Sequence, residues 1–231
     1  MRIVVNHVTR MKDARICVAG LDAATFRHVR PVTSSKSAYM TRALLREHGG
    51  PFGTGALVDL GTVAACPNAP ETEDHRFAAA RAKRVRDLAH DVYFELLHRV
   101  SDEDFPTAFG PELVEVRPRK FAVPAGRGKR SLAVVPVVNP KLRVEFKKLY
   151  LTVGAPSTPA KLRVTDVRFY DADHALKRKV IYDVNRRLAS GVTAYAMLGL
   201  ARAIPDDDAG DVHWLMANGL CLADRAVGDV P

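Results

Sequence analysis

Two runs of basic side chains without a neighbouring carboxylate carry the clearest chemistry of this sequence. One run extends from Arg76 to Arg86 and the other from Arg117 to Arg130, and neither contains Asp or Glu. Unpaired cations raise the local electrostatic potential, and each phosphate that they neutralise releases a bound counterion. The runs therefore predict a polyanionic partner, and we expect nucleic acid; a merely solvated basic surface is the alternative.

The expected phosphate contacts are cations of these two runs and two arginines further upstream. They are Arg27, Arg30, Arg76, Arg81, Lys83, Arg84, Arg86, Arg119, Lys120, Arg127, Lys129 and Arg130. Arg30 precedes Pro31, which favours an extended backbone at the rim of a strand; a structural salt bridge is the alternative for Arg30.

Aromatic side chains are only 7% of the chain, so little base stacking is available. The candidates that lie beside cations are Phe26, His28, Phe121 and Tyr150, and each could instead belong to the core. We therefore expect binding dominated by phosphate contacts, with little sequence specificity and with single-stranded DNA or RNA favoured.

Evidence for catalysis is weak in this sequence. The eight histidines form no H-x-x-x-H or H-E-x-x-H spacing, and the three cysteines form no C-x-x-C pair. Glu73, Asp74 and His75 could contribute to a metal-dependent nuclease, which is a less favoured alternative. We assign no catalytic residue, no metal site and no cofactor. A small-ligand or nucleotide sensor with one enclosed pocket is the other alternative to an open binding stripe.

The composition fits a folded protein of one large or two small domains. The 231 residues are 47% hydrophobic and 26% charged, with a net charge of +9.

Residues 205–231 hold six aspartates against one arginine. The turn at residues 206–211 is expected to be drawn toward the basic surface, or else only to keep a hairpin soluble. Scattered cysteines and an N-terminus interrupted by charges predict a cytoplasmic protein without a membrane span.

The chain reads as short strands interrupted by helices. Strands are predicted at residues 3–8, 15–21, 25–32, 56–64, 132–138, 141–147, 161–170, 192–204 and 213–222. Helices are predicted between Ser37 and Gly49, at 89–100 and at 174–188. In 141–147 the charged and apolar residues alternate strictly, so one side of a hairpin with 161–170 faces solvent and is mostly basic. The predicted class is mostly β with about three helices.

Two successive sets of about five strands predict two small barrels in tandem. Prolines and glycines between residues 106 and 128 mark the boundary, so we expect halves at 1–120 and 121–231.

Several short motifs resemble the dual-OB (DuOB) domain family. They occur in order along the chain: Cys17-Val-Ala-Gly20, Arg30-Pro-Val-Thr33, Ser131-Leu132, Val164-Thr-Asp166, His213-Trp214 and Asn218-Gly-Leu220. The resemblance implies two OB folds, which are Greek-key barrels of about five strands whose face and loops commonly hold oligonucleotides. It supplies no catalytic residues.

Overall fold

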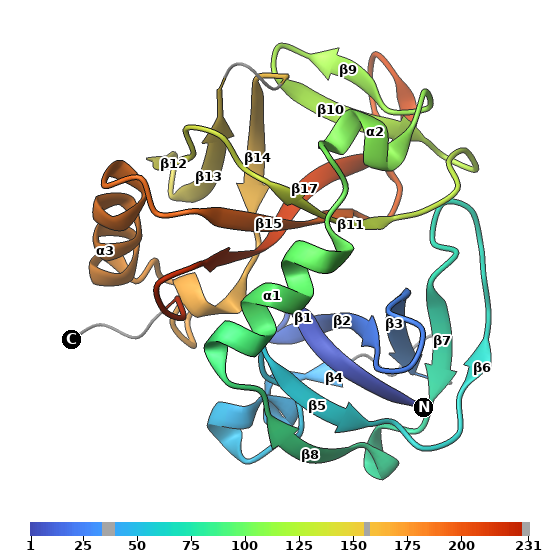
Figure 1. Ribbon diagram of the computed structural model, residues 1–231. Coiled ribbons are helices and arrows are strands. Elements are labelled where there is room, and N and C mark those ends of the chain that lie inside the picture. The colour runs from blue at the N-terminus through green and yellow to red at the C-terminus, as the bar shows by residue number, and fades with distance from the viewer. Residues whose placement is uncertain (34–39, 155–157, 228–231) are drawn as a thin grey trace.

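The structure is a computed structural model that describes residues 1–33, 40–154 and 158–227. Within these residues the chain forms two strongly curled sheets and three α-helices (Figure 1). The expected class, mostly β with about three helices and OB-like halves, is confirmed. No helix of the described residues is long and apolar enough to cross a membrane.

The first sheet is built around β1. Its strands are β1 (Arg2–Arg10), β2 (Arg15–Asp22), β3 (His28–Thr33), β4 (Met40–Thr41), β5 (Ala56–Asp59), β6 (Ala64–Ala65), β7 (Asp74–Phe77) and β8 (Lys83–Asp87). They lie in the order β6-β7-β3-β2-β1-β5-β8, with β4 against β2. β3 and β7 are parallel and the other pairs are antiparallel.

The second sheet contains the remaining strands. They are β9 (Val114–Arg117), β10 (Lys120–Pro124), β11 (Leu132–Pro136), β12 (Lys141–Glu145), β13 (Lys148–Val153), β14 (Ala160–Val164), β15 (Ala194–Leu200), β16 (Ile204–Asp206) and β17 (Gly210–Leu222). The main path is β11-β15-β17-β14-β13-β12, and β14 runs parallel to β17. A boundary was expected at residue 120, where β10 begins; β10 pairs with β9 and also with β17.

The two sheets share one plan. In each, three antiparallel strands are followed by a parallel pairing with a strand much later in the chain, β3 with β7 and β14 with β17. In the second half, α3 (Arg178–Ala189) lies between β14 and β15. A meander closed by a parallel strand, with a helix before the fourth strand, is the Greek-key plan of the OB fold.

The helices agree only in part with the sequence prediction. α1 (His90–Val100) and α3 are present, and a short α2 (Phe105–Phe109) was not expected. The helix predicted after Ser37 is wrong for the described residues: two 3₁₀ turns, Arg42–Leu44 and Arg46–His48, replace it. Leu45 between them is extended and buried, which interrupts the helical repeat. Ser37 itself lies outside the described residues.

The hairpin prediction was also wrong in its pairing. β13 lies between the two strands that were expected to pair, so β12 pairs with β13 and β13 with β14. Two more 3₁₀ turns occur at Ala79–Arg81, before β8, and at Val167–Phe169, after β14.

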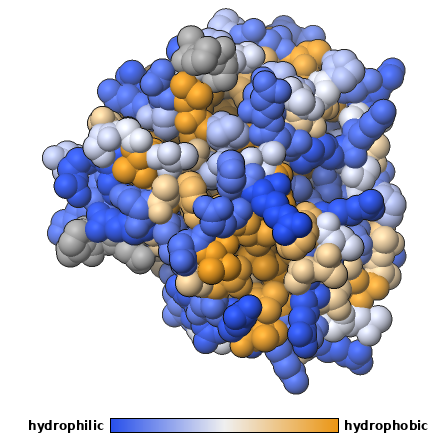
Figure 2. Space-filling view, viewed as in Figure 1, coloured by the Kyte–Doolittle hydropathy of each residue, from blue (hydrophilic) through white to orange (hydrophobic). Residues whose placement is uncertain are grey.

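α1 lies where the two sheets meet (Figure 1). Its buried Tyr93 and Leu97 pack with Val4 of the first sheet and with Tyr195 and Met197 of the second. Apolar side chains gather over α1 and the strands beneath it, while most of the rest of this face is hydrophilic (Figure 2). Burial of apolar side chains from both sheets against one helix stabilises a fixed arrangement of the halves.

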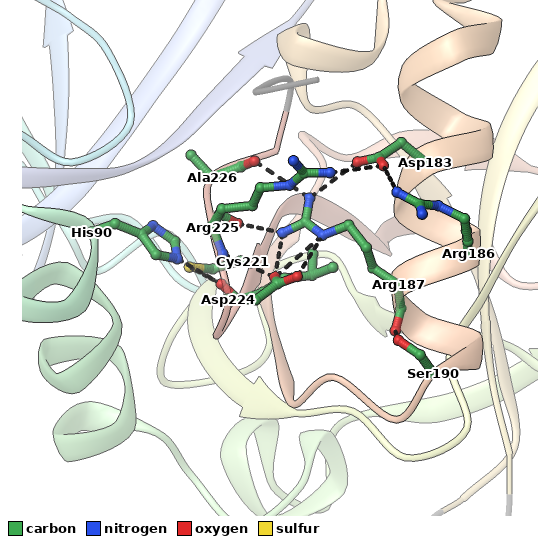
Figure 3. A network of polar contacts seen from close by, with 10 residues as sticks. His90, Asp183, Arg186, Arg187, Ser190, Cys221, Asp224, Arg225 and Ala226 are labelled. Atoms are coloured by element: carbon green, nitrogen blue, oxygen red, sulfur yellow. Dashed lines mark hydrogen bonds and ion pairs between the residues drawn. The ribbon is translucent and has the colours of Figure 1, made fainter. Parts of the chain in front are cut away.

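Charged side chains attach the C-terminal segment to α3. Arg187 is buried and donates to the carboxylates of Asp183 and Asp224 and to the carbonyl of Arg225, at 2.6 Å. Arg225 in turn reaches Asp183 at 2.9 Å. Figure 3 shows these side chains from the helix and the segment pointing toward one another. Asp224 therefore pairs with a buried arginine of the same half.

Candidate nucleic-acid interface

Three neighbouring strands of the second half, β12 to β14, expose one continuous basic face. Arg143, Tyr150 and Arg163 lie directly opposite one another across the three strands. Because side chains alternate along a strand, the residues in between point inward, and Leu142, Leu151 and Leu162 are buried in the core. We call the outward side of these strands the β12–β14 face; its cations are Lys141, Arg143, Lys148, Lys161 and Arg163.

The β12–β14 face has one carboxylate, Glu145, and this acid is already paired. Lys161 donates to Glu145, and that hydrogen bond, together with the charges of Lys161, Arg143 and Arg119, lowers the pKa of Glu145. The Nζ of Lys161 also lies 4.7 Å from the ring centroid of Tyr150. The face therefore combines a surplus of cations with a half-buried aromatic ring at its centre.

The β12–β13 turn adds an exposed aromatic side chain to this face. Phe146 and Lys147 form a two-residue turn with φ angles of 46° and 60°. Gly or Asn normally occupies such positions, because a left-handed backbone costs other residues about 1–2 kcal/mol. Phe146 is nevertheless 94% exposed, so its ring stabilises nothing within the chain. An exposed aromatic ring on a strained backbone is available for contact with a partner.

The predicted Arg119 adjoins this face. It occupies the β9–β10 turn with a φ of 62°, and its carbonyl accepts a 2.7 Å hydrogen bond from the backbone N–H of Lys161. Lys120 follows as the first residue of β10 and is half-buried. Two predicted contacts thus lie next to cations that the sequence analysis had placed on a solvent-facing hairpin but had left out of the site.

The predicted residues of the first basic run lie on the first sheet instead. Lys83, Arg84 and Arg86 are exposed on β8, which ends that sheet, and Arg84 reaches Asp87 at 3.4 Å. Arg76 is exposed on β7, and Arg81 is exposed in the 3₁₀ turn before β8. Because β7 and β8 both belong to the other half, these residues lie on surfaces separate from the β12–β14 face.

The remaining predicted cations lie near the junction of the halves. Arg127 and Lys129 are exposed in the β10–β11 loop, and the carbonyl of Lys129 accepts a 2.9 Å hydrogen bond from Thr72. Arg130 forms a 3.0 Å ion pair with Asp102. Arg27 is exposed and lines the same cleft as Arg130. The sequence runs are therefore divided among several surfaces, because consecutive residues fold into different strands and loops.

Comparison with known proteins assigns the family. The model of the dual OB-containing domain matches residues 1–185. The chain belongs to the dual OB-containing domain family. No curated protein matches this dual OB chain.

Two solved structures resemble it at low similarity. The p204 HINb domain is 11% identical over 93% of this chain and 89% of that one, with a TM-score of 0.35. A murine DNA-binding protein bound to double-stranded DNA is 6% identical over 98% of this chain and 97% of its own, with a TM-score of 0.34. Similarities this low carry no functional conclusion.

Arg30 of the dual OB chain is a structural residue, which corrects its placement among the phosphate contacts. Its side chain is 5% exposed and its Nε donates to Asp74 at 2.5 Å. Asp74 also pairs with Arg202 of the second half at 2.8 Å, and Arg202 pairs with Glu71 at 3.0 Å. The alternative interpretation of Arg30, a salt bridge, is the one the structure has.

Two other family motifs, Ser131-Leu132 and Val164-Thr-Asp166, also contact the first half. The carboxylate of Glu73 accepts hydrogen bonds from the N–H and hydroxyl of Ser131, at 2.8 and 2.9 Å. Asp166 pairs with Arg168 at 2.6 Å and accepts from the N–H of Leu220. Since Glu73 and Asp74 are buried and hold residues of the other half, their geometry supports an architectural role rather than the metal-dependent nuclease alternative.

Phe121 and the acidic hairpin, two further features noted in the sequence, lie in different environments. Phe121 is buried against Phe105, with ring centroids 5.1 Å apart, so it belongs to the core. In the acidic hairpin, Asp206 pairs with Arg117 at 2.7 Å, and Asp208 lies 3.9 Å from the same guanidinium. The acidic hairpin thus contacts the first arginine of the second basic run.

Proposed function

We propose that this dual OB protein binds nucleic acid, with single-stranded DNA or RNA favoured, on the β12–β14 face. The observation that carries the proposal is one surface with four cations unpaired within the described residues, the half-exposed ring of Tyr150 at its centre and the exposed ring of Phe146 at its end, where the single carboxylate already pairs with Lys161. A polyanion gains there the electrostatic attraction that paired charges cannot offer.

The chemistry of the face favours single strands over duplexes. Cations spaced along strands can follow a flexible phosphate backbone, and flat rings can stack on unpaired bases of any sequence. The outward residues of β12 to β14 include no Asn or Gln, the side chains that read adenine edges. We therefore expect phosphate-dominated binding with little base preference. Arg119, Lys120, Arg127 and Lys129 are the nearest candidates for extending the path along the second half.

A salt titration with two matched triple variants tests the proposal. The face variant is Lys141→Gln, Arg143→Gln and Lys148→Gln, and the control is Lys83→Gln, Arg84→Gln and Arg86→Gln on β8. Each removes three exposed cations, so the change in net charge is identical. Binding of oligo-dT and oligo-U is measured between about 50 and 200 mM salt, beside duplexes of equal length.

The two variants are expected to differ. Loss of three phosphate contacts lowers the slope of log affinity against log salt by about 2 for single strands, so the face variant should show a flatter slope and weaker binding. The β8 control should keep nearly the original slope. A larger loss in the β8 variant would move the site to the first sheet. Affinity that does not change with salt in the unaltered protein would contradict an open phosphate-binding face.

A further inference from the structure

A cleft of about 640 Å³ lies where the two halves meet, away from the β12–β14 face. Residues from five parts of the chain line it: Met1, the β2–β3 turn with its flanking residues, the start of β7, the end of α1 with Asp102, and Arg130. The residues that matter below are Phe26, Arg27, His28, His75, Asp102 and Arg130. Its size is within the range of pockets that hold small organic ligands.

One cation in this cleft is free to bind an anionic group. Arg27 is exposed and has no ion-pair partner among the described residues. Two wall carboxylates are already satisfied: Asp22 accepts from the N–H and hydroxyl of Thr25 at 2.8 and 2.9 Å, and Glu73 accepts from Ser131. Asp102 is paired with Arg130 at 3.0 Å. The oxygens of Asp22 and Glu73 are occupied by neutral donors and keep their negative charge, so an anionic group is expected to bind on the side of the cleft where the Arg27 guanidinium is free.

The same cleft contains aromatic rings, and one of them has ring nitrogens without hydrogen-bond partners in the part of the chain that is described. Among the described residues, neither ring nitrogen of His28 has a hydrogen-bond partner, although both are buried. Burial, then the neighbouring His7 and the charge of Arg130, hold the pKa of His28 well below its ordinary value. The ring is therefore neutral near pH 7, with one donor and one acceptor.

Two further rings complete the wall. Phe26 has a left-handed backbone with a φ of 59°, and the guanidinium of Arg99 covers its ring at 4.5 Å from the centroid. The Nδ1–H of His75 donates to the carbonyl of Glu73 at 2.9 Å, which leaves Nε2 for another group. Rings and a free cation around one hollow suit a ligand that is planar at one end and anionic at the other.

We propose that this cleft binds a nucleoside 5′-monophosphate group, with the base against Phe26 and His28 and the phosphate on Arg27. This inference goes beyond the proposed function, because the cleft is formed by both halves and is separate from the β12–β14 face. The group has two possible sources, a free mononucleotide or the 5′-phosphorylated end of an oligonucleotide.

Calorimetric titration of the full chain with AMP, adenosine and inorganic phosphate tests the site. AMP should bind measurably more tightly than either of its parts, because only AMP occupies the rings and the guanidinium together. Arg27→Ala should weaken AMP binding about tenfold, the expected loss for a hydrogen bond to a charged group. His28→Phe keeps a ring and removes both nitrogens, and should also weaken AMP. Arg86→Ala, an exposed arginine on β8, should leave the AMP affinity unchanged.

Oligonucleotides with and without a 5′-phosphate distinguish the two sources. If strand ends are the ligand, oligo-dT with a 5′-phosphate should bind more tightly than its unphosphorylated form, and Arg27→Ala should remove that advantage. If free nucleotides are the ligand, AMP binds and the two oligonucleotides bind alike. Absence of both effects, or AMP binding that Arg27→Ala does not weaken, would overturn the inference. The β12–β14 proposal is measured with unphosphorylated oligonucleotides, so the two can fail independently.

Discussion

Asp74→Asn should destabilise the whole protein, because Asp74 neutralises a buried arginine at the junction of the halves. Arg30 and Asp74 have side chains that are 5% and 8% exposed, and Nη2 of Arg30 already lacks a partner among the described residues. Asparagine keeps the shape of Asp74 but removes the negative charge, which leaves the Arg30 cation buried and uncompensated.

The expected cost follows from burial. Removing one partner of a buried ion pair typically costs about 3–5 kcal/mol. The second partner, Arg202, is 52% exposed and keeps Glu71, so its loss adds little. Arg30→Met with Asp74→Leu removes both buried charges together, and should recover most of the lost stability, since apolar replacements of buried pairs are often neutral.

Urea unfolding followed by two probes measures this effect. Trp214 is the single tryptophan and lies in β17, so its fluorescence follows the second half, while circular dichroism follows both halves. Asp74→Asn should lower both midpoints together, because Asp74 bonds residues of both halves. Asp59→Asn is the matched control: its pair with Arg2 is exposed, so the cost should stay below about 1 kcal/mol.

Two results would refute this reasoning. A cost of Asp74→Asn no larger than that of Asp59→Asn would mean that water reaches Arg30. A double variant as unstable as the single variant would mean that packing around the pair, and not its charge, determines the stability.

Three other perturbations give separate tests. Phe146→Gly should raise the free energy of unfolding by about 1 kcal/mol by relieving the left-handed backbone, and should weaken oligo-dT binding by roughly tenfold through loss of stacking; Phe146→Ala should weaken binding without that gain. Burial lowers the pKa of His7 from 6.5 to about 4. Unfolding therefore takes up a proton between these values, so about 3 kcal/mol of stability present above pH 6.5 should be lost as the pH falls toward 4, and His7→Gln should flatten this dependence in urea midpoints measured across the range. Asparagine at residues 206–208 should free Arg117 and raise oligonucleotide affinity several-fold at low salt, more than the same charge change made with asparagine at the exposed acids Asp91, Asp171 and Asp173; equal gains would leave the acidic turn as a solubilising element.

Local patterns in the sequence predicted those features that depend on neighbouring residues. Strict alternation at residues 141–147 placed Arg143 outward and Leu142 inward, as the structure has them. Apolar spacing located α1 and α3. The same reasoning failed after Ser37, because the apolar residues there serve extended and 3₁₀ backbone, a choice made by packing of Leu45 into the first core.

The candidate face required pairing between distant strands. Each strand showed its own basic side in the sequence, but register decides that Arg143, Tyr150 and Arg163 share one surface. The exposed ring of Phe146 could have been suspected from the sequence, since a large apolar residue followed by two lysines sits where a tight turn must fall.

What the sequence alone determined is the class of the protein, its family and its surplus of positive charge. These follow from composition, period and short motifs, which are properties of residues close together in the chain. The tertiary structure decided which charges remain free. The sequence left Arg30 open between a phosphate contact and a salt bridge, and the structure shows that it pairs with Asp74, 44 positions away, which Arg202, 128 positions beyond Asp74, also binds. Burial and pairing depend on such distant partners, and they separate an arginine that holds the two halves together from one that can bind phosphate.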